Sequence, residues 1–163
     1  METTMNIQEK AAVVIHPEAL LEHWQGHRRL TRRVIEAFPE KELFDYSVGG
    51  MRPFADLAKE LLAMASPIAH GVATGEWSAF GEIKANTKQE ILELWDAETE
   101  KINTYWTQIP LERFQEVDVA FGQYENTNIN TIFYAIDNEN HHRGQGYVYL
   151  RSLGITPPFF WER

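Results

Sequence analysis

The sequence predicts an all-α protein, a four-helix bundle with a long ordered connection before the last helix. Four segments repeat apolar residues every three to four positions, which is the period of one helix face. Prolines, glycines and a capping motif mark where these segments begin or end. The length of 163 residues favours one domain over residues 1–163, because two halves would each approach the lower size limit for an independent core.

Apolar ladders bounded by prolines indicate the first two helices. The first is expected over about residues 17–38, with Pro17 in its first turn and Pro39 ending it. Residues 45–51 contain two glycines and are expected to form a loop. The second helix begins near Pro53, and Pro67 is expected to kink it or to start a new short piece. The two ladders consist of Leu20, Trp24, His27, Thr31, Val34 and Phe38, and then of Phe54, Leu57, Leu61, Met64 and Ile68.

The third helix has the clearest start signal. Thr87 and Glu90 have the spacing of a capping box, and an apolar stripe follows as far as Pro110. Residues 111–126 show only weak alternation and no helical stripe, so we expect an ordered connection outside the helical core, with short extended pieces. The fourth helix is expected over about residues 127–153, ended by Gly154.

Composition and charge narrow the classes of function. The 15 Lys and Arg against 24 Asp and Glu give a net charge of −9, which disfavours nucleic-acid and anionic-membrane partners. The absence of cysteine excludes disulfides, thiolate metal sites and cysteine nucleophiles. Neither a signal pattern in the first ten residues nor an apolar run of membrane-spanning length is present. We therefore expect a cytoplasmic protein.

A polar pair interrupts the stripe of the fourth helix. Asn138 and His142 are four residues apart and therefore share one helix face, whose other members are apolar or small. Polar groups that face a bundle core need partners, which either a hydrogen-bond network or a metal ion supplies. His141 lies one residue away from this face.

The stretch from Asn140 to Gln145, with the sequence NHHRGQ, resembles the last helix of the DinB/YfiT-like superfamily. The following YVYLR and LGITPP stretches and the RPFADLAKEL stretch of the second helix match as well. This resemblance extends over the whole chain. It implies a four-helix bundle with a crossing connection between the second and third helices, often dimeric. Many members hold a divalent metal through three histidines, one from the second helix and two from the last.

Carried over position by position, the resemblance implies a metal site at Glu60, Asn138 and His142. A carboxylate, a carboxamide and an imidazole can together hold a divalent ion such as zinc, nickel, manganese or iron, although more weakly than three imidazoles. The alternative is a metal-free, hydrogen-bonded triad. Gln145 and Tyr149 are expected to support the site from outside, and His27 is the second-choice ligand.

Other histidines and arginines have simpler interpretations. His23 and His27 form an H-x-x-x-H pair without the glutamate of a metalloprotease motif, so His27 is expected to fill the edge of the core. His70 is expected to cap a helix end and His16 to lie in a surface loop. The basic cluster is expected to form a cationic strip on the outer face of the first helix, paired with acidic neighbours; its members are Arg28, Arg29, Arg32 and Arg33.

Two functions remain open at this stage. The resemblance implies a metal-dependent enzyme acting on a small molecule, because relatives include thiol S-transferases, a thiol-dependent isomerase and hydrolases; the substrate would then be a small thiol or amide. The alternative is a non-catalytic, metal-free bundle that binds a small molecule or a protein partner. A homodimer is also expected, because the chain has more large aromatic residues than one small bundle buries. They are Trp77, Phe80, Trp95, Trp106, Phe159, Phe160 and Trp161.

Overall fold

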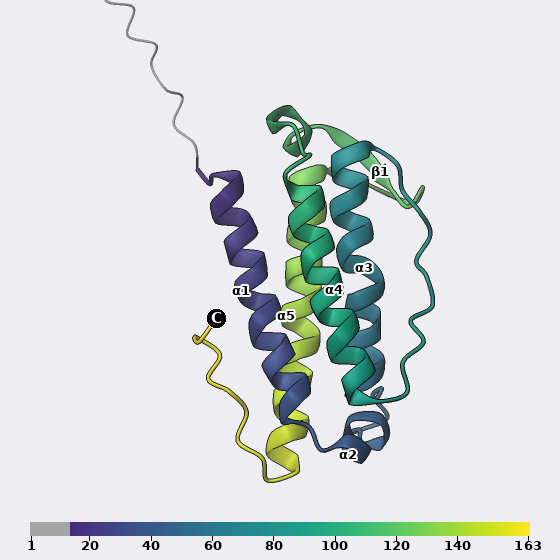
Figure 1. The fold of residues 1–163 in the computed structure, drawn as a ribbon, viewed down its shortest axis with the longest axis vertical. Coiled ribbons are helices and arrows are strands. Elements are labelled where there is room, and N and C mark those ends of the chain that lie inside the picture. Colours follow the sequence, from purple (N-terminus) through teal and green to yellow (C-terminus); the bar gives the residue numbers. More distant parts are fainter. Residues whose placement is uncertain (1–13) are drawn as a thin grey trace, which may run out of the picture.

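Four long helices form the body of the protein in the computed structural model, which describes residues 14–163 (Figure 1). They are α1 (Pro17–Ala37), α3 (Phe54–Thr74), α4 (Lys88–Trp106) and α5 (Asn128–Ser152). The predicted all-α, four-helix bundle is confirmed. The N-terminal segment considered above for a signal pattern lies outside the described residues. Within the described part of the chain, no helix combines the length and apolarity needed to cross a membrane.

The order of the helices includes one long crossing connection. After α1, the short helix α2 (Glu40–Asp45) turns the chain into α3. Residues 75–87 then run back along the outside of α3, so that α3 and α4 point in the same direction (Figure 1). The crossing connection that the family resemblance implied is therefore present, as in bundles that depart from a simple up-and-down order.

Two local features differ from what was predicted. The helix α2 was missed, because only Leu43 of its six residues is buried and so short a segment has no readable stripe. Pro67 was expected to kink its helix or to start a new short piece, and the second alternative was wrong, since α3 continues to Thr74 with the proline inside it. The flanking Met64 and Ile68 are buried in the core. This packing holds the helix together across the backbone hydrogen bond that proline removes.

The connection before α5 is ordered and lies outside the helical core, as predicted. It contains a 3₁₀ helix, η1 (Leu111–Phe114), and a hairpin of two antiparallel strands, β1 (Val117–Ala120) and β2 (Tyr124–Thr127). The register pairs Val117 with Thr127 and Ala120 with Tyr124. The predicted capping box of α4 is also present: Glu90 N–H donates to Thr87 Oγ1, and Thr87 N–H donates to the Glu90 carboxylate.

A polar layer divides the apolar core into two clusters. One cluster surrounds Phe54 and Trp95, and the other surrounds Trp24 and Ile132. Between them lie buried polar side chains from α1, α4 and α5: Gln25, His27, Arg28, Thr31, Glu98, Glu139, His142 and Arg143. Hydrogen bonds within this layer fix the relative rotation of the helices, because each buried polar group needs a partner at a defined place.

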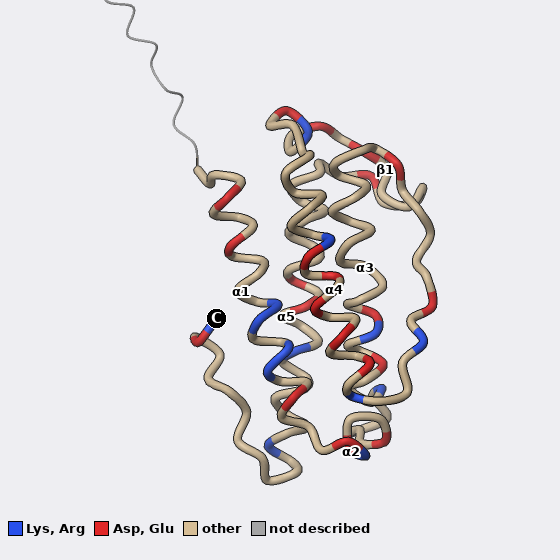
Figure 2. The backbone as a smooth tube through the Cα atoms, viewed as in Figure 1, with Lys and Arg blue, Asp and Glu red and all other residues tan. Residues whose placement is uncertain are grey.

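The arginine cluster on α1 only partly matches the predicted outer strip (Figure 2). Arg29, Arg32 and Arg33 pair with the acidic residues Glu22, Glu36, Asp96 and Glu162. Arg28, in contrast, is 1% exposed, and its guanidinium lies 4.3 Å over the ring of Trp95. Its Nη2 donates to the Trp95 carbonyl oxygen at 3.2 Å. The prediction that Arg28 belongs to an external strip was therefore wrong.

Gly146 allows α5 to approach the core closely. A Cβ at this position would lie 2.5 Å from the ring of Phe54, which is fully buried and stacks on Phe38. We expect Gly146→Ala to lower the free energy of unfolding by roughly 1–2 kcal/mol, because a buried ring must shift. Chemical denaturation measures this loss. Gly144→Ala is the matched control: its Cβ meets nothing within 4 Å, so it should leave stability unchanged or raise it.

Candidate functional site

Three side chains that the resemblance picked out come together between α3 and α5. His142 Nε2 lies 3.0 Å from Glu60 Oε1, and Asn138 Nδ2 lies 3.4 Å from the same oxygen. Asn138 Nδ2 is also 3.4 Å from the sulfur of Met64. The four-residue spacing on α5 places Asn138 and His142 on one face, and Glu60 reaches them from the facing helix.

Two residues outside this triad complete the arrangement. Arg52, just before α3, forms an ion pair with Glu60 in which Nη2 and Oε2 are 2.7 Å apart. Gln145 Oε1 lies 3.2 Å from His142 Nδ1. Both ring nitrogens of His142 thus have a polar partner within hydrogen-bonding distance.

The carboxylate of Glu60 is well stabilised by these contacts. Burial raises the pKa of the Glu60 carboxyl, but the hydrogen bonds from His142, Arg52 and Asn138 outweigh burial and hold its pKa below the ordinary value. The side chain is 33% exposed, whereas that of His142 is 7% exposed. A fixed, negatively charged oxygen pair therefore reaches solvent-accessible space beside a nearly buried imidazole.

A cavity of about 740 Å³ opens beside Glu60. It lies between α3, α5, the hairpin and the segment that connects α3 to α4. Its walls are mostly apolar and aromatic, with polar groups from the hairpin and α5. The residues that form them are Glu60, Ala63, Met64, Ile68, Phe80, Ala120, Phe121, Gln123, Tyr124, Glu125, Asn126, Thr131 and Tyr134.

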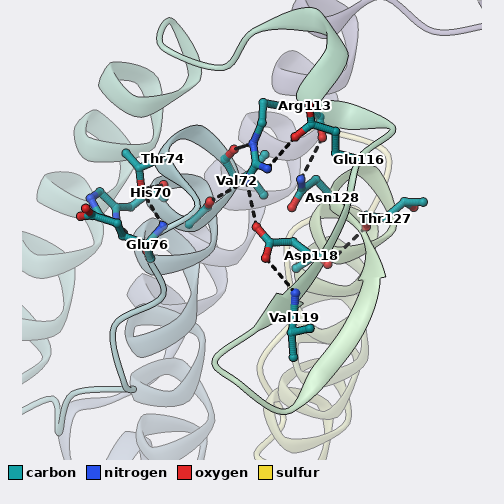
Figure 3. A network of polar contacts seen from close by, with 12 residues as sticks. His70, Val72, Thr74, Glu76, Arg113, Glu116, Asp118, Val119, Thr127 and Asn128 are labelled. Atoms are coloured by element: carbon teal, nitrogen blue, oxygen red, sulfur yellow. Dashed lines mark hydrogen bonds and ion pairs between the residues drawn. The ribbon is translucent and has the colours of Figure 1, made fainter.

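Hydrogen bonds and an ion pair of Arg113 connect the hairpin, which forms one wall of the cavity, to the end of α3 (Figure 3). Its guanidinium donates to the carbonyl oxygen of Val72 at 3.0 Å and pairs with Asp118 at 2.9 Å. Asn128, the first residue of α5, donates to the Arg113 carbonyl oxygen at 2.9 Å. In the same view, His70 Nδ1 lies 3.1 Å from the Glu76 carbonyl oxygen just beyond α3, where a capping histidine was expected.

The remaining predicted site residues lie elsewhere or act indirectly. His27 does not join Glu60; its ring contacts His23, Arg143 and Arg163 in the polar layer. Tyr149 does not touch the triad, but its hydroxyl donates to the carbonyl oxygen of Arg52 at 2.9 Å. It therefore fixes the backbone of the residue that pairs with Glu60.

Arg52, Met64 and the hairpin residues were missed as members of the site. Arg52 precedes its helix and acts through a long side chain, so no helical spacing relates it to Glu60. Met64 was visible only as a member of an apolar stripe. The hairpin approaches the cavity through the tertiary fold, for which the sequence contains no local signal.

The donor set does not fit the divalent metal that the resemblance implies. Glu60 would be the only anionic ligand, and its second oxygen is already paired with the Arg52 guanidinium. Asn138 directs a hydrogen-bond donor, not an oxygen, toward the carboxylate. Among residues 14–163, no three side chains of His, Cys, Asp or Glu are grouped so that they could hold an ion. The positive charge of Arg52 opposes a second cation at the same carboxylate.

These features define a helical bundle of the crossing-connection type with a small polar site on two facing helices. The chain belongs to the DinB family, since the sequence model of that family matches residues 1–162. It is 28% identical over 149 residues to the uncharacterized Bacillus subtilis protein YjoA, covering 88% of this chain and 96% of YjoA.

Solved structures show the same fold. The crystal structure of YjoA, a DinB-like protein, matches with a TM-score of 0.73 and 23% identity, covering 88% of this chain and 99% of the other. A DinB-like protein from Bacillus cereus matches with a TM-score of 0.71 and 19% identity, covering 88% and 97%. A variant of mycothiol-dependent maleylpyruvate isomerase matches with a TM-score of 0.58 and 14% identity, covering 85% of this chain and 68% of that protein.

Proposed function

We propose that this protein binds a small molecule in the cavity beside Glu60 and does so without a divalent metal. One observation carries the proposal: a carboxylate fixed by His142 and Arg52 lies in the wall of a mostly apolar cavity of about 740 Å³. Ligand sites combine these features, since apolar walls supply binding energy and a few fixed polar groups set orientation.

In this proposal, the Glu60–His142 pair takes the place of a metal centre as the polar end of the site. His142, Arg52 and Asn138 hold the carboxylate in place by direct contact, and Arg52 offsets its charge. A bound molecule then meets a preorganised polar group that needs little rearrangement, which favours binding.

Filling the cavity tests the proposal. We expect Ala63→Trp to occupy the space beside Glu60 and to abolish binding of molecules found in a fragment screen by amide NMR shifts. Ala97→Trp is the matched control, because it adds the same ring to an exposed position on α4. Fragments that bind both variants equally, with shifts far from the cavity, would contradict the proposed site.

The second candidate is the metal-dependent enzyme acting on a small thiol or amide, and membership of the DinB family favours it. Elemental analysis of untagged protein for zinc, nickel, manganese and iron separates the candidates. We expect less than about 0.1 ion per chain, because only one of the three positions is histidine and Arg52 opposes a cation. A tightly held, near-stoichiometric ion that Glu60→Ala and His142→Ala each remove would establish the metal site and overturn the metal-free proposal.

A variant that should gain a metal site complements the elemental analysis. The double substitution Glu60→His and Asn138→His places three imidazoles at the same positions. We expect it to gain a zinc ion that the parent protein lacks, since three histidines with one open position suit Zn²⁺. The ion should then be lost again when His142→Ala is added.

The expected homodimer and cytoplasmic location remain predictions. Trp95 and Trp106, counted toward a dimer surface, are buried inside the bundle, so that part of the reasoning was wrong. The C-terminal tail runs beside α1 (Figure 1), yet its aromatic residues Phe159, Phe160 and Trp161 are 53–67% exposed. We expect light scattering to give a dimer mass. A monomer mass at high concentration would contradict it.

A further inference from the structure

The charged residues that line the cavity are all acidic. Glu60 lies at its inner wall and Glu125 on the hairpin, and the lining residues, which all belong to the described part of the chain, include neither lysine nor arginine. Arg52 pairs with the Oε2 atom of Glu60 and offsets the charge of that carboxylate, so Glu125 is the acidic lining residue on which the attraction of a cation rests. The whole chain carries a net charge of −9. An anionic ligand would therefore be repelled from this cavity, and a cationic ligand attracted.

Aromatic rings form part of the cavity wall. Phe80, Phe121, Tyr124 and Tyr134 contribute to its lining. The rings of Phe80 and Phe121 are 4.1 Å apart between centroids, and Trp77 supports Phe121 from 5.2 Å. The faces of such rings attract ammonium groups through their quadrupole. Acidic and aromatic groups in one cavity thus favour the same kind of ligand.

The backbone at Phe121 gives independent support for this role. Its φ is +55°, in the left-handed region that bulky residues rarely adopt. Among residues 14–163, Phe121 is the only non-glycine residue with a positive φ. A glycine or asparagine would make the same turn with less strain. The chain nevertheless places a phenylalanine there, where its ring forms part of the cavity wall. An unfavourable conformation kept at such a position indicates a use for the side chain.

We infer that the cavity selects an organic cation, an amine or quaternary ammonium with an apolar or aromatic body, over neutral and anionic molecules of similar shape. This inference rests on the proposed function, because it names the class of ligand for that same cavity. The ammonium group lies between Glu125 and the aromatic rings, and the body of the ligand packs on Met64 and Ile68.

Three probes of similar shape and different charge test this inference: 2-phenylethylamine, 2-phenylethanol and 3-phenylpropanoate. Titration at neutral pH and low salt, followed by amide NMR shifts, should give the amine at least about tenfold higher affinity than the alcohol, with the propanoate weakest. Equal binding of amine and alcohol at the cavity would overturn the inference and leave the proposed function standing. The absence of shifts at the cavity with all three probes at about 10 mM would contradict both.

Two variants of the cavity wall and one control variant separate the effects of the local charge and the ring from that of the net charge of the protein. Glu125→Gln should weaken amine binding about three- to fivefold and leave alcohol binding unchanged. Phe121→Leu keeps an apolar wall but removes the ring, and should likewise weaken the amine more than the alcohol. Glu100→Gln removes the same charge from an exposed position on α4 and should have little effect. Equal losses in Glu125→Gln and Glu100→Gln would overturn the inference.

Discussion

Replacement of Glu139 with alanine is expected to lower the free energy of unfolding by roughly 3–5 kcal/mol, because it empties a buried position and removes a carboxylate that interacts with buried Arg28 and Arg143. Glu139 is 2% exposed and accepts a hydrogen bond of 2.5 Å from the Thr31 hydroxyl. The same hydroxyl oxygen accepts a hydrogen bond from Arg143 Nη1 at 3.2 Å. Arg28, 1% exposed, also interacts with this carboxylate. Chemical denaturation at neutral pH measures the loss.

The charge and the hydrogen bonds of the Glu139 carboxyl can be tested separately with matched variants. Burial raises the pKa of its carboxyl, opposed by Arg28, the Thr31 hydrogen bond and Arg143. Glu139→Gln keeps the shape and an acceptor for Thr31 but removes the same charge, so it should lose less stability than Glu139→Ala and still be less stable than the parent. Glu100→Ala, exposed on α4, should stay within about 0.5 kcal/mol of the parent. A loss of less than about 1 kcal/mol in Glu139→Ala would show that the layer does not depend on this carboxylate.

The periodic elements of this fold are predictable from sequence because burial imposes a repeat. The helices α1, α3, α4 and α5 each bury apolar residues in the core, and prolines or a capping box mark the starts of the first three. No apolar stripe marks α2, which buries one residue. At Pro67, the local preference of proline predicts an interruption, but packing against the core lets α3 continue past this residue to Thr74.

The site could be predicted only in part, for a related reason. Helical spacing places Asn138 and His142 on one face, but only the family resemblance pointed to Glu60. Which side chains approach from elsewhere depends on the tertiary fold: Arg52 comes from a loop and Phe121 from the hairpin. Tertiary packing also explains the error at Arg28, which was predicted to be exposed because it is cationic and lies at the edge of an apolar stripe. In the structure it is buried over Trp95, where hydrogen bonds and a ring face satisfy its guanidinium.

His27 should give the protein a marked loss of stability in acid. Its ring lies between two guanidinium groups, with Arg143 Nη2 2.9 Å from Nδ1 and Arg163 Nη1 3.0 Å from Nε2. A neutral imidazole accepts a hydrogen bond at one nitrogen only, so this environment opposes an added proton at either position. Burial and the charges of Arg143, His23 and Arg163 lower the pKa of His27 to about 4.

The sign of the effect follows from the protons bound by each state. The unfolded chain protonates this histidine below about pH 6.5, whereas the folded protein resists until about pH 4. Between these values the unfolded state binds more protons, so stability falls as the pH falls through this window. In His27→Gln, stability should therefore decline less between pH 7 and 4 than in the parent, by roughly 2–3 kcal/mol. Carboxylates such as Glu60 titrate in both proteins and cancel in the difference. Denaturation curves at several pH values measure it, and an NMR titration of the His27 ring should give a midpoint near 4. Parallel stability profiles for the two proteins would show that His27 is protonated as readily in the folded state as in the unfolded chain.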